Sequence, residues 1–437
     1  MKTVIMAGGK GTRISSVASD IPKPMIEIDG IPVLQREIEC LKGQGFCDII
    51  ITVSHLGRII MDYFKDGSDF GVNIEYYNEE TALGNAGALF KIKEKLTEDF
   101  LLLNADAVFD IDFNRMLEFH KEKKALVTLF THPNSHPYDS GLIIANSDKV
   151  VKSWLTKEDI RPEYYKNRVN AGLHIISPKV LDMLMIDSKR IGEKDEEGKI
   201  VKVDLDRQLL KPLAGTGVMY CYDSPEYVKD MGTPDRYEAV CNDYVHGIVQ
   251  GKNLSNKQKA IFVDRDGTIN KYVGFLRNIN EFELETGVSK AIKKINHSEY
   301  LVIVVTNQPV IARGEVTYQE LEAIHNKMET LLGLDGAYVD AIYFCPHHPH
   351  KGYAGEIPEL KLDCDCRKPK PGMLLQAAVE YNIDLSNSYM IGDGENDVLA
   401  GEAAGCKTIL IDREKKNYCC EPSFIVNSFV EAIDLIL

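Results

Sequence analysis

The apolar segments of this chain are short, and they alternate with stretches of helical periodicity along most of its 437 residues. That alternation is typical of parallel sheets covered by helices on both faces. A polar segment, 250–259, interrupts it, and a fresh apolar run begins at Ala260. A chain of this length also exceeds one ordinary hydrophobic core. We therefore predict an α/β protein of two doubly wound domains, 1–249 and 260–437, joined by a linker over 250–259.

The same pattern predicts individual elements. Strands are expected at 4–6, 49–53 and 100–103 in the first domain, and at 260–263, 301–306, 389–391 and 408–411 in the second. Helices are expected at 33–42 and 84–96. Thr233 followed by Pro234 is typical of an N-cap and a first helical position, so another helix should run from there to about 249.

Charge and composition exclude several classes of partner. The formal net charge is -15, which disfavours nucleic acid and anionic membranes, because both select basic surfaces. No apolar run is long enough to cross a bilayer, and the first residues lack a signal-peptide pattern. Cys40, Cys47, Cys221 and Cys241 are scattered, as buried thiols usually are. We expect a cytoplasmic protein with reduced cysteines.

A glycine-rich turn follows the first expected strand. It contains Gly8, Gly9, Gly11, Thr12 and Arg13, and Lys23 lies between two prolines shortly after it. Glycines in such a turn let backbone N–H groups approach phosphate oxygens closely. The turn lacks the Gly-Lys-Ser/Thr ending of a Walker A loop and is a poor dinucleotide fingerprint, so by itself it is a weak signal.

Together with four later motifs, this turn resembles the signature of the sugar-1-phosphate nucleotidyltransferases. The later motifs are Leu83-Gly84-Asn85-Ala86-Gly87, Leu103-Asn104-Ala105-Asp106, Asn170-Ala171-Gly172 and Asp230-Met231-Gly232-Thr233-Pro234. All five stand in the order that the family shows. The resemblance implies a Rossmann-like domain in which a sugar phosphate attacks the α-phosphorus of a nucleoside triphosphate and pyrophosphate leaves.

That resemblance also implies roles for single residues. Gly8, Gly9, Gly11, Thr12, Gly84 and Asn104 would bind the nucleotide, and Arg13 and Lys23 would supply positive charge to the triphosphate. Asp106 and Asp230 would hold Mg²⁺, a hard ion that prefers carboxylates. Lys157, Asn170 and Gly172 would bind the sugar phosphate. Thr156 in place of the family's glutamate, and Ala105 in place of its glycine, bear on which sugar is recognised.

A second reactive site is expected after the apolar run 260–263. Asp264 and Asp266 are two positions apart at the end of that strand, so both carboxylates can point the same way. One can attack phosphorus, and the other can protonate the leaving oxygen and then activate water. Neighbouring negative charges disfavour an ionised nucleophile, so a cation is required. The segment Asp264-Arg265-Asp266-Gly267-Thr268 resembles the haloacid dehalogenase-type phosphatases.

The three other motifs of that family have counterparts here, namely Thr306-Asn307-Gln308, Arg367-Lys368-Pro369 and Ile391-Gly392-Asp393. The resemblance implies that Thr306, Asn307 and Gln308 contact the phosphoryl group, and that Lys368 offsets its charge. Asp264, Asp266 and Asp393 would hold Mg²⁺, with Asp397 supporting the last of these loops.

A possible metal centre lies between those motifs. Cys345, His347, Cys364 and Cys366 offer three thiolates and one imidazole, which suits tetrahedral Zn²⁺ in a structural site. His348 and His350 are further candidates, but the Cys-x-His spacing favours His347. The alternative is two unrelated pairs of thiols.

This zinc loop resembles that of two relatives, the heptose bisphosphate and histidinol-phosphate phosphatases. The segment that includes Arg313, after Thr306-Asn307-Gln308, and the Cys366-Arg367 pair look like the heptose enzyme, so Arg313 and Arg367 would contact substrate. Pro309-Val310 departs from the Ser-Gly that the heptose enzymes usually carry at this point.

The two reactions can be linked, because a phosphatase acting on a sugar bisphosphate leaves a sugar 1-phosphate. The resemblance implies removal of the 7-phosphate from D-glycero-D-manno-heptose 1,7-bisphosphate. Coupling to GTP would then give GDP-heptose for surface glycans such as lipopolysaccharide. We expect Mg²⁺ in both domains, structural Zn²⁺, small sugar phosphates and nucleotides as partners, and leave a homo-oligomer open. The alternatives are another sugar such as a mannose derivative, a histidinol-phosphate activity, or a regulatory binding protein with an inactive catalytic half.

Overall fold

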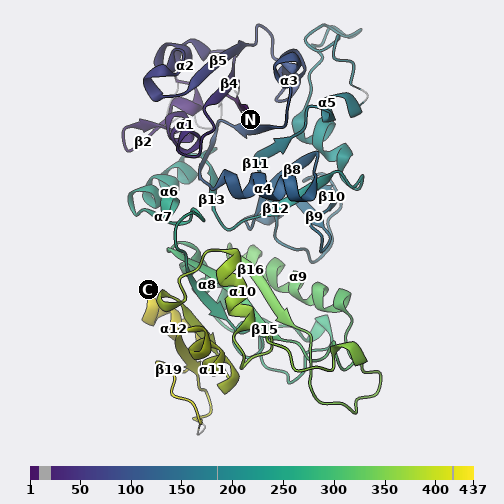
Figure 1. The fold of residues 1–437 in the computed structure, drawn as a ribbon, viewed down its shortest axis with the longest axis vertical. Helices are drawn as coiled ribbons and strands as arrows, with labels where there is room; N and C mark the ends of the chain where they lie inside the picture. Colours follow the sequence, from purple (N-terminus) through teal and green to yellow (C-terminus); the bar gives the residue numbers. More distant parts are fainter. Residues whose placement is uncertain (9–20, 185, 416–417) are drawn as a thin grey trace. The chain divides into compact units, whose positions relative to one another are not determined.

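The computed structural model describes residues 1–8, 21–184, 186–415 and 418–437, which form two compact units (Figure 1). Unit 1 comprises Met1–His132, Gly141–Thr156 and Asn170–Asn253, and unit 2 comprises Pro133–Ser140, Lys157–Val169 and Leu254–Leu437. Two short segments from the first half of the sequence therefore belong to unit 2. Among the described residues, no helix combines the length and the apolar character that crossing a membrane requires.

Unit 1 is built on a mixed nine-stranded sheet. Its strands are β1 (Thr3–Met6), β4 (Asp48–Val53), β5 (Asn73–Asn78), β6 (Phe100–Asn104), β8 (Val127–His132), β9 (Leu142–Ala145), β10 (Val151–Leu155), β11 (Val169–Ile176) and β12 (Met219–Asp223). The path runs β10-β9-β11-β6-β1-β4-β5, and β8 joins β11 to β12. β1 is parallel to β4 and β6, whereas β11 runs antiparallel to β6.

Helices cover both faces of this sheet, because its strands are apolar on both sides. The helices are α1 (Val33–Gly43), α2 (Gly57–Phe64), α3 (Gly87–Lys91), α4 (Phe113–Lys123), α5 (Val180–Met183), α6 (Pro234–Val245) and α7 (Ile248–Gly251). Val4 on β1 packs into one core with residues of α3 and α5, and Ile5 packs into the other with residues of α1, α2 and α4. Unit 1 is thus doubly wound.

Two helix predictions in unit 1 need correction. The helix expected over 84–96 is reduced to α3 and a 3-10 turn, η4 (Lys93–Lys95), because Gly84 has a φ of +83° that no α-helix contains. The helix after Thr233 begins as predicted, with the Thr233 side chain accepting from the Arg236 N–H at 3.4 Å. It ends at Val245, because Gly247 adopts a φ of +71° before α7 begins.

Unit 2 contains a six-stranded sheet that is parallel throughout. Its strands are β14 (Lys259–Val263), β15 (Tyr300–Asn307), β16 (Ala341–Cys345), β17 (Tyr389–Gly392), β18 (Lys407–Ile411) and β19 (Phe424–Val426), in the order β16-β15-β14-β17-β18-β19. The helices are α8 (Val288–Asn296), α9 (Tyr318–Leu334), α10 (Gly372–Glu380), α11 (Glu395–Ala404) and α12 (Phe429–Ile436). Alternate residues of β14 enter two cores, one with α8, α9 and α12, the other with α10 and α11.

The segment 157–169 is held in unit 2 by buried polar contacts. Arg168 and Glu329 of α9 are both buried, with Nη1 of the arginine 3.4 Å from Oε2 of the glutamate. The same Oε2 accepts from the Asn167 N–H at 2.8 Å, and Arg168 Nη2 donates to the Asp340 carbonyl at 2.8 Å. Pairing of this kind is what allows charged groups to be buried at all.

Candidate active sites and metal centre

Asp106 and Asp230 are brought together in unit 1 by a two-stranded ribbon. β7 (Ala107–Asp110) and β13 (Tyr227–Asp230) are antiparallel, with Asp230 opposite Ala107. Lys23, in the 3-10 turn η2 (Lys23–Met25), donates to Asp106 Oδ2 at 2.7 Å. Three residues with predicted roles in nucleotidyl transfer therefore lie close together, although they come from three separate stretches of sequence.

The Asp230 carboxylate is strongly held. Nη1 of Arg236 lies 3.0 and 2.7 Å from its two oxygens, and the Gly232 N–H donates to Oδ1 at 2.7 Å. Burial acts to raise its pKa, but Arg236, the Gly232 N–H and the charge of Lys23 hold that pKa below its usual value. An ionised oxygen ligand beside Asp106 suits a hard divalent cation, so the donor set fits Mg²⁺. The ligand roles stay predictions.

Glu37 is a third acidic side chain in this region, and the sequence analysis missed it. It lies on α1, is 1% exposed, and neither carboxylate oxygen has a hydrogen-bond partner among the described residues. Burial, followed by the charge of Asp106, raises its pKa well above the ordinary value. A glutamate on the apolar face of a predicted helix was the available signal, since Leu34, Ile38 and Leu41 share that core.

Most of the predicted phosphate loop (Gly9, Gly11, Thr12 and Arg13) lies outside the described residues. Gly8 is described, and its carbonyl accepts from Ser54 Oγ at 2.8 Å. A Cβ atom built on Gly8 would lie 3.4 Å from Oε1 of Glu79, whose Oε2 accepts from the Leu83 N–H at 3.3 Å. Glu79 thus lies next to Gly8 and accepts a hydrogen bond from the segment predicted to contact the base.

Asn104 and Gly172, predicted to contact nucleotide and sugar, are in direct contact. Gly172 has a φ of +78°, and a Cβ atom there would lie 2.4 Å from Asn104 Nδ2. Only glycine fits both the conformation and the space. Gly84 is similarly restricted, since its Cβ would lie 2.3 Å from the Val203 carbonyl oxygen. Lys157 belongs to unit 2, so its role at this site stays a prediction.

In unit 2 the predicted reactive residues gather at the carboxyl ends of the parallel strands, where α/β folds bind ligands. Asp264 follows β14 and Asp393 follows β17, on neighbouring strands. The ligand atoms of Asp264, Asp393 and Asp397 all lie within 4.8 Å of one another. The Nζ atom of Lys368 donates to Asp264 and Asp397, both at 2.6 Å, and to the Val305 carbonyl at 2.7 Å.

The positive charge of Lys368 is not enough to keep the carboxyl groups of Asp264 and Asp393 at their ordinary pKa. Burial, joined by the charges of Asp397 and Asp266, raises the pKa of Asp264 to about 8 against the opposing effect of Lys368. Burial and Asp397 raise the pKa of Asp393 to about 6. A divalent cation beside these oxygens would keep them ionised, so the residues fit Mg²⁺. Asp264 and Asp393 would hold it, and it would supply charge neutralisation.

The Asp266 carboxylate is not one of the grouped ligand atoms and is held by other side chains. Nη2 of Arg265 lies 2.9 and 2.7 Å from its two oxygens, Gln308 Nε2 donates to Oδ2 at 2.8 Å, and Asn270 Nδ2 donates to Oδ1 at 3.1 Å. Burial opposes ionisation, but Arg265 and these amides lower the pKa of Asp266. The third possible metal ligand among the described residues is Asp397, whereas the sequence analysis expected Asp266. A side-chain ligand role for Asp266 stays a prediction.

Arg265 is fully buried, and its second partner is a histidine that the sequence analysis missed. Arg265 Nη1 donates to His325 Nε2 of α9, at 3.2 Å. Burial, followed by the charge of Arg265, lowers the pKa of His325 to about 3, so the ring is neutral and can accept this bond. The arginine between the two aspartates was visible in the sequence, but its histidine partner was not.

Thr306 and Asn307, which are also predicted to contact the phosphoryl group, are held by hydrogen bonds to other parts of unit 2. Thr306 Oγ1 accepts from Gln308 Nε2 at 3.0 Å. Asn307 Oδ1 accepts from the Lys368 N–H at 3.0 Å, and Asn307 Nδ2 donates to the Lys368 carbonyl at 2.9 Å, which fixes the backbone that carries this lysine.

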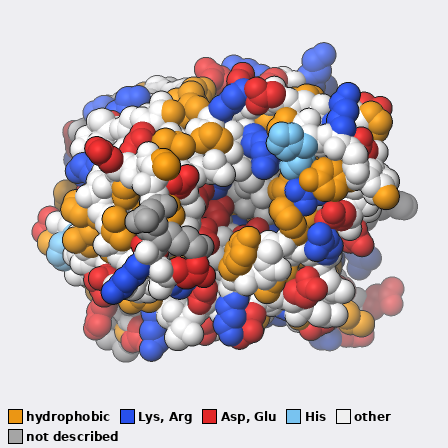
Figure 2. Space-filling view, turned by 90° about the horizontal axis from the view of Figure 1, so that it is seen from below, with side chains coloured by type: hydrophobic (Ala, Val, Ile, Leu, Met, Phe, Trp, Pro, Cys, Tyr) orange, Lys and Arg blue, Asp and Glu red, His pale blue; other side chains and the backbone are white. Residues whose placement is uncertain are grey.

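Arg313 and Arg367 are both anchored near the zinc loop. The Arg313 guanidinium lies 4.0 Å from the Phe275 ring centroid and 4.5 Å from that of Tyr353. Its Nη2 donates to His348 Nε2 at 3.2 Å. Arg367 Nη1 donates to the His347 carbonyl at 3.2 Å. The view of unit 2 in Figure 2 shows a hollow near the middle of the face, with acidic and basic side chains around it.

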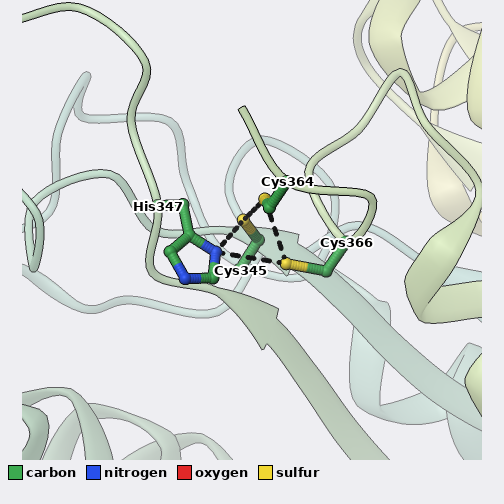
Figure 3. A group of neighbouring side chains, drawn as sticks. All are labelled: Cys345, His347, Cys364 and Cys366. Carbon is green, nitrogen blue, oxygen red and sulfur yellow. Dashed lines mark hydrogen bonds between the residues drawn. The ribbon is translucent and has the colours of Figure 1, made fainter. Parts of the chain in front are cut away.

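The four predicted zinc ligands point toward one another (Figure 3). Cys345 Sγ lies 3.4 Å from Cys364 Sγ and 3.7 Å from His347 Nδ1, while Cys366 Sγ lies 3.2 Å from Cys364 Sγ and 3.4 Å from His347 Nδ1. In a tetrahedral site with Zn–S bonds of about 2.3 Å and a Zn–N bond of about 2.0–2.1 Å, the ligand atoms lie roughly 3.5–3.8 Å apart, which is close to these separations. Burial and the neighbouring Cys366 raise the pKa of Cys345, so a metal is needed to hold it as a thiolate. The cluster can form a zinc site.

Comparisons with known proteins match the two halves of the chain to different families. A family model described as nucleotidyl transferase matches residues 2–247, and one described as HAD-hydrolase-like matches 365–432. The D-glycero-beta-D-manno-heptose-1,7-bisphosphate 7-phosphatase of Haemophilus ducreyi is 40% identical over 184 residues, which is 41% of this chain and 98% of that protein. The enzyme of the same name from Escherichia coli K12 is 42% identical over 37% of this chain and 83% of its own length. The solved structure of HddC from Yersinia pseudotuberculosis is 25% identical over 56% of this chain and 99% of its own, with a TM-score of 0.46.

Fold, sites and relatives together define a bifunctional enzyme, in which a Rossmann-like nucleotidyltransferase domain precedes a haloacid dehalogenase-type phosphatase domain. The chain belongs to the nucleotidyl transferase family through its first half, and to the family of heptose bisphosphate phosphatases through its second.

Proposed function

We propose that unit 2 removes the 7-phosphate from D-glycero-D-manno-heptose 1,7-bisphosphate, and that unit 1 transfers GMP from GTP to the resulting heptose 1-phosphate. The observation that carries the phosphatase half is the buried cluster of Lys368 with Asp264 and Asp397 at the carboxyl end of β14. We assign the heptose as substrate because the relatives that match this half are named as heptose bisphosphate phosphatases. Both reactions would occur in the cytoplasm, where the triphosphate is available.

In the phosphatase half, we assign Asp264 as the nucleophile and Asp266 as the acid and base. An Asp264 oxygen forms a bond to phosphorus while the bond from phosphorus to the sugar oxygen breaks, and Asp266 gives that oxygen a proton. Because Arg265 and the neighbouring amides lower its pKa, Asp266 must first take up this proton from solvent. Asp266 then takes a proton from water, whose oxygen attacks the phosphoryl group and frees Asp264 and inorganic phosphate. Lys368, fixed by Asn307, offsets negative charge next to the nucleophile throughout.

In the nucleotidyltransferase half, the 1-phosphate oxygen attacks the α-phosphorus of the nucleotide, and the bond to pyrophosphate breaks. Little covalent work falls to the protein, which must align two polyanions and neutralise their charge. We assign that work to Lys23 and the phosphate loop. Asp106 and Asp230 would hold Mg²⁺, which supplies further neutralising charge.

Glu79 supports guanine as the base. Its carboxylate lies between Gly8 and Leu83, and only Oε2 has a hydrogen-bond donor among the described residues. Guanine carries an exocyclic N–H₂ donor beside its ring N–H, whereas adenine lacks that pair of donors. A carboxylate at this position therefore favours guanine over adenine.

The test is an end-point product analysis of the full chain with heptose 1,7-bisphosphate, Mg²⁺ and each of the four nucleoside triphosphates in turn. We expect release of inorganic phosphate in every reaction and a nucleotide-sugar only with GTP. Fructose 1,6-bisphosphate and histidinol phosphate serve as comparison substrates. Turnover of either of those with none of the heptose compound would reject the proposed sugar.

A further inference from the structure

His174 is a buried histidine in unit 1 to which the proposed reaction assigns no role. It lies on β11, is 0% exposed, and its Nε2 atom lies 3.0 Å from Oδ1 of Asn170 on the same strand. Four residues of extended strand span about 13 Å, so these side chains would not meet on a regular strand. The left-handed conformation of Gly172, with φ of +78°, bends the chain between them and makes the contact possible.

The geometry fixes the orientation of the Asn170 amide. The backbone N–H of Gly172 points at Asn170 Oδ1 from 3.4 Å, and a backbone N–H can only donate. The atom at that position is therefore the amide oxygen, and His174 Nε2 must carry a proton and donate to it as well. Burial lowers the pKa of His174 to about 3, so the ring is neutral, with its proton on Nε2 and a lone pair on Nδ1.

In this arrangement the amide oxygen of Asn170 accepts hydrogen bonds, and the N–H₂ group of the same amide remains available as a donor. Asn170 Oδ1 receives two N–H groups, whereas Nδ2 has no hydrogen-bond partner among the described residues. The His174 Nδ1 atom is also buried, and it has no hydrogen-bond partner among the described residues. Within the described structure the ring therefore makes no second hydrogen bond. Asn170 is partly exposed beside Gly172, which contacts Asn104.

We propose that His174 is a positioning residue for sugar recognition, which holds Asn170 with its N–H₂ group facing the sugar phosphate. The site then selects a sugar by an acceptor oxygen at that point, and a sugar that lacks this oxygen is bound more weakly. The inference rests on the proposed role of unit 1, and specifically on Asn170 as a sugar contact.

The experiment compares His174→Phe, His174→Gln and Asn170→Ala with the wild-type chain. The probes are D-glycero-D-manno-heptose 1-phosphate and GTP, with KM measured for each. Loss of one hydrogen bond to a substrate corresponds to roughly a threefold to tenfold change. We expect His174→Phe to raise the KM for the sugar phosphate by about that factor and to leave the KM for GTP unchanged.

Two further variants separate positioning from a general loss of structure. His174→Gln keeps an N–H donor and should recover most of the affinity. In the double variant of His174→Phe with Asn170→Ala, the KM should equal that of Asn170→Ala, because the histidine acts only through the asparagine. His120→Leu is the control, since His120 is equally buried in unit 1 and contacts Thr128 Oγ1 at 2.8 Å. That variant should lower stability without changing the KM for the sugar phosphate.

The outcomes distinguish the inference from the function on which it rests. An unchanged KM in Asn170→Ala would reject Asn170 as a sugar contact, and the proposed site with it. A raised KM in Asn170→Ala with none in His174→Phe, or additive effects in the double variant, would reject the positioning role alone. Nitrogen-15 NMR of the wild-type ring tests the same point without a variant. A proton on Nδ1 in place of Nε2 would overturn the inference.

Discussion

The Nζ atom of Lys368 lies 2.6 Å from Oδ1 of Asp264, and both side chains are buried. Burial alone would lower the pKa of this lysine, but Asp264 and Asp397 raise it above its ordinary value. The ammonium group is therefore both the local counter-charge of the predicted nucleophile and a part of the interior of unit 2.

Replacing Lys368 by Met should destabilise unit 2 as well as inactivate it. Removing one partner of a buried ion pair leaves an uncompensated charge, which costs about 3–5 kcal/mol. Chemical denaturation measures this, and phosphate release should fall to background. Lys370→Met is the matched control, because Lys370 is 40% exposed and pairs with the exposed Asp363. A change as large in the control would show that burial of the pair is not the cause.

Asp264→Asn tests whether the two sites work independently. The amide has the shape of the carboxylate but cannot attack phosphorus, so phosphate release from heptose bisphosphate should cease. Nucleotidyl transfer to supplied heptose 1-phosphate should continue at the wild-type rate. Loss of both activities in a folded variant would contradict separate sites.

Cys364→Ser should lower the zinc content of the purified chain and the thermal stability of unit 2. The serine hydroxyl is a poor zinc ligand, and structural zinc sites contribute directly to folding. Metal analysis and thermal unfolding measure the two effects. Cys406→Ser changes a buried cysteine outside the cluster and should retain zinc. Equal zinc content in both variants would reject the ligand set.

Glu79→Gln should weaken discrimination among nucleotides. Replacing one carboxylate oxygen by an N–H₂ group places a donor against the donors of guanine. The value of kcat/KM for GTP should fall by roughly ten- to a hundredfold, since one base contact is worth about 1–3 kcal/mol. The value for ATP should change much less. Glu80→Gln, at the exposed neighbouring position, is the control. Equal losses for GTP and ATP would count against base recognition.

His325 should make the stability of unit 2 depend on pH. Burial and Arg265 lower its pKa in the folded state to about 3, whereas the unfolded value is about 6.5. Between these values the unfolded chain binds more protons, so the stability present above about pH 6.5 is lost as the pH falls. One such group contributes a slope of up to about 1.4 kcal/mol per pH unit. Denaturation of the wild-type chain and of His325→Asn between those limits should reveal a shallower slope in the variant, with the exposed His297→Asn as control.

The sequence analysis was most successful where a short contiguous segment determines the outcome. The runs that became β14, β15, β17 and β18 were predicted to within one residue at each end, because a buried parallel strand is apolar throughout. The predicted helix over 84–96 was wrong, because its pattern of apolar residues does not reveal that Gly84 adopts a left-handed conformation against Val203.

The reactive residues show the same contrast. Asp264, Lys368 and Asp393 belong to recognisable motifs, so their meeting in space could be predicted before the structure was known. Glu37 and His325 have no such motif, and their surroundings come from chain segments that only the fold brings near. Burial without a partner, or with one unusual partner, is a tertiary property that local spacing does not encode.

Cys366 lies two positions before Lys368, so one short piece of backbone carries both a potential zinc ligand and the counter-charge of the predicted nucleophile. Zinc bound at that cluster would make the metal supply and the oxidation state of three thiols conditions for dephosphorylation. No described cysteine or histidine in unit 1 belongs to such a metal-binding group. Zinc deficiency or oxidising conditions would therefore impair dephosphorylation, the first proposed reaction, before nucleotidyl transfer, the second.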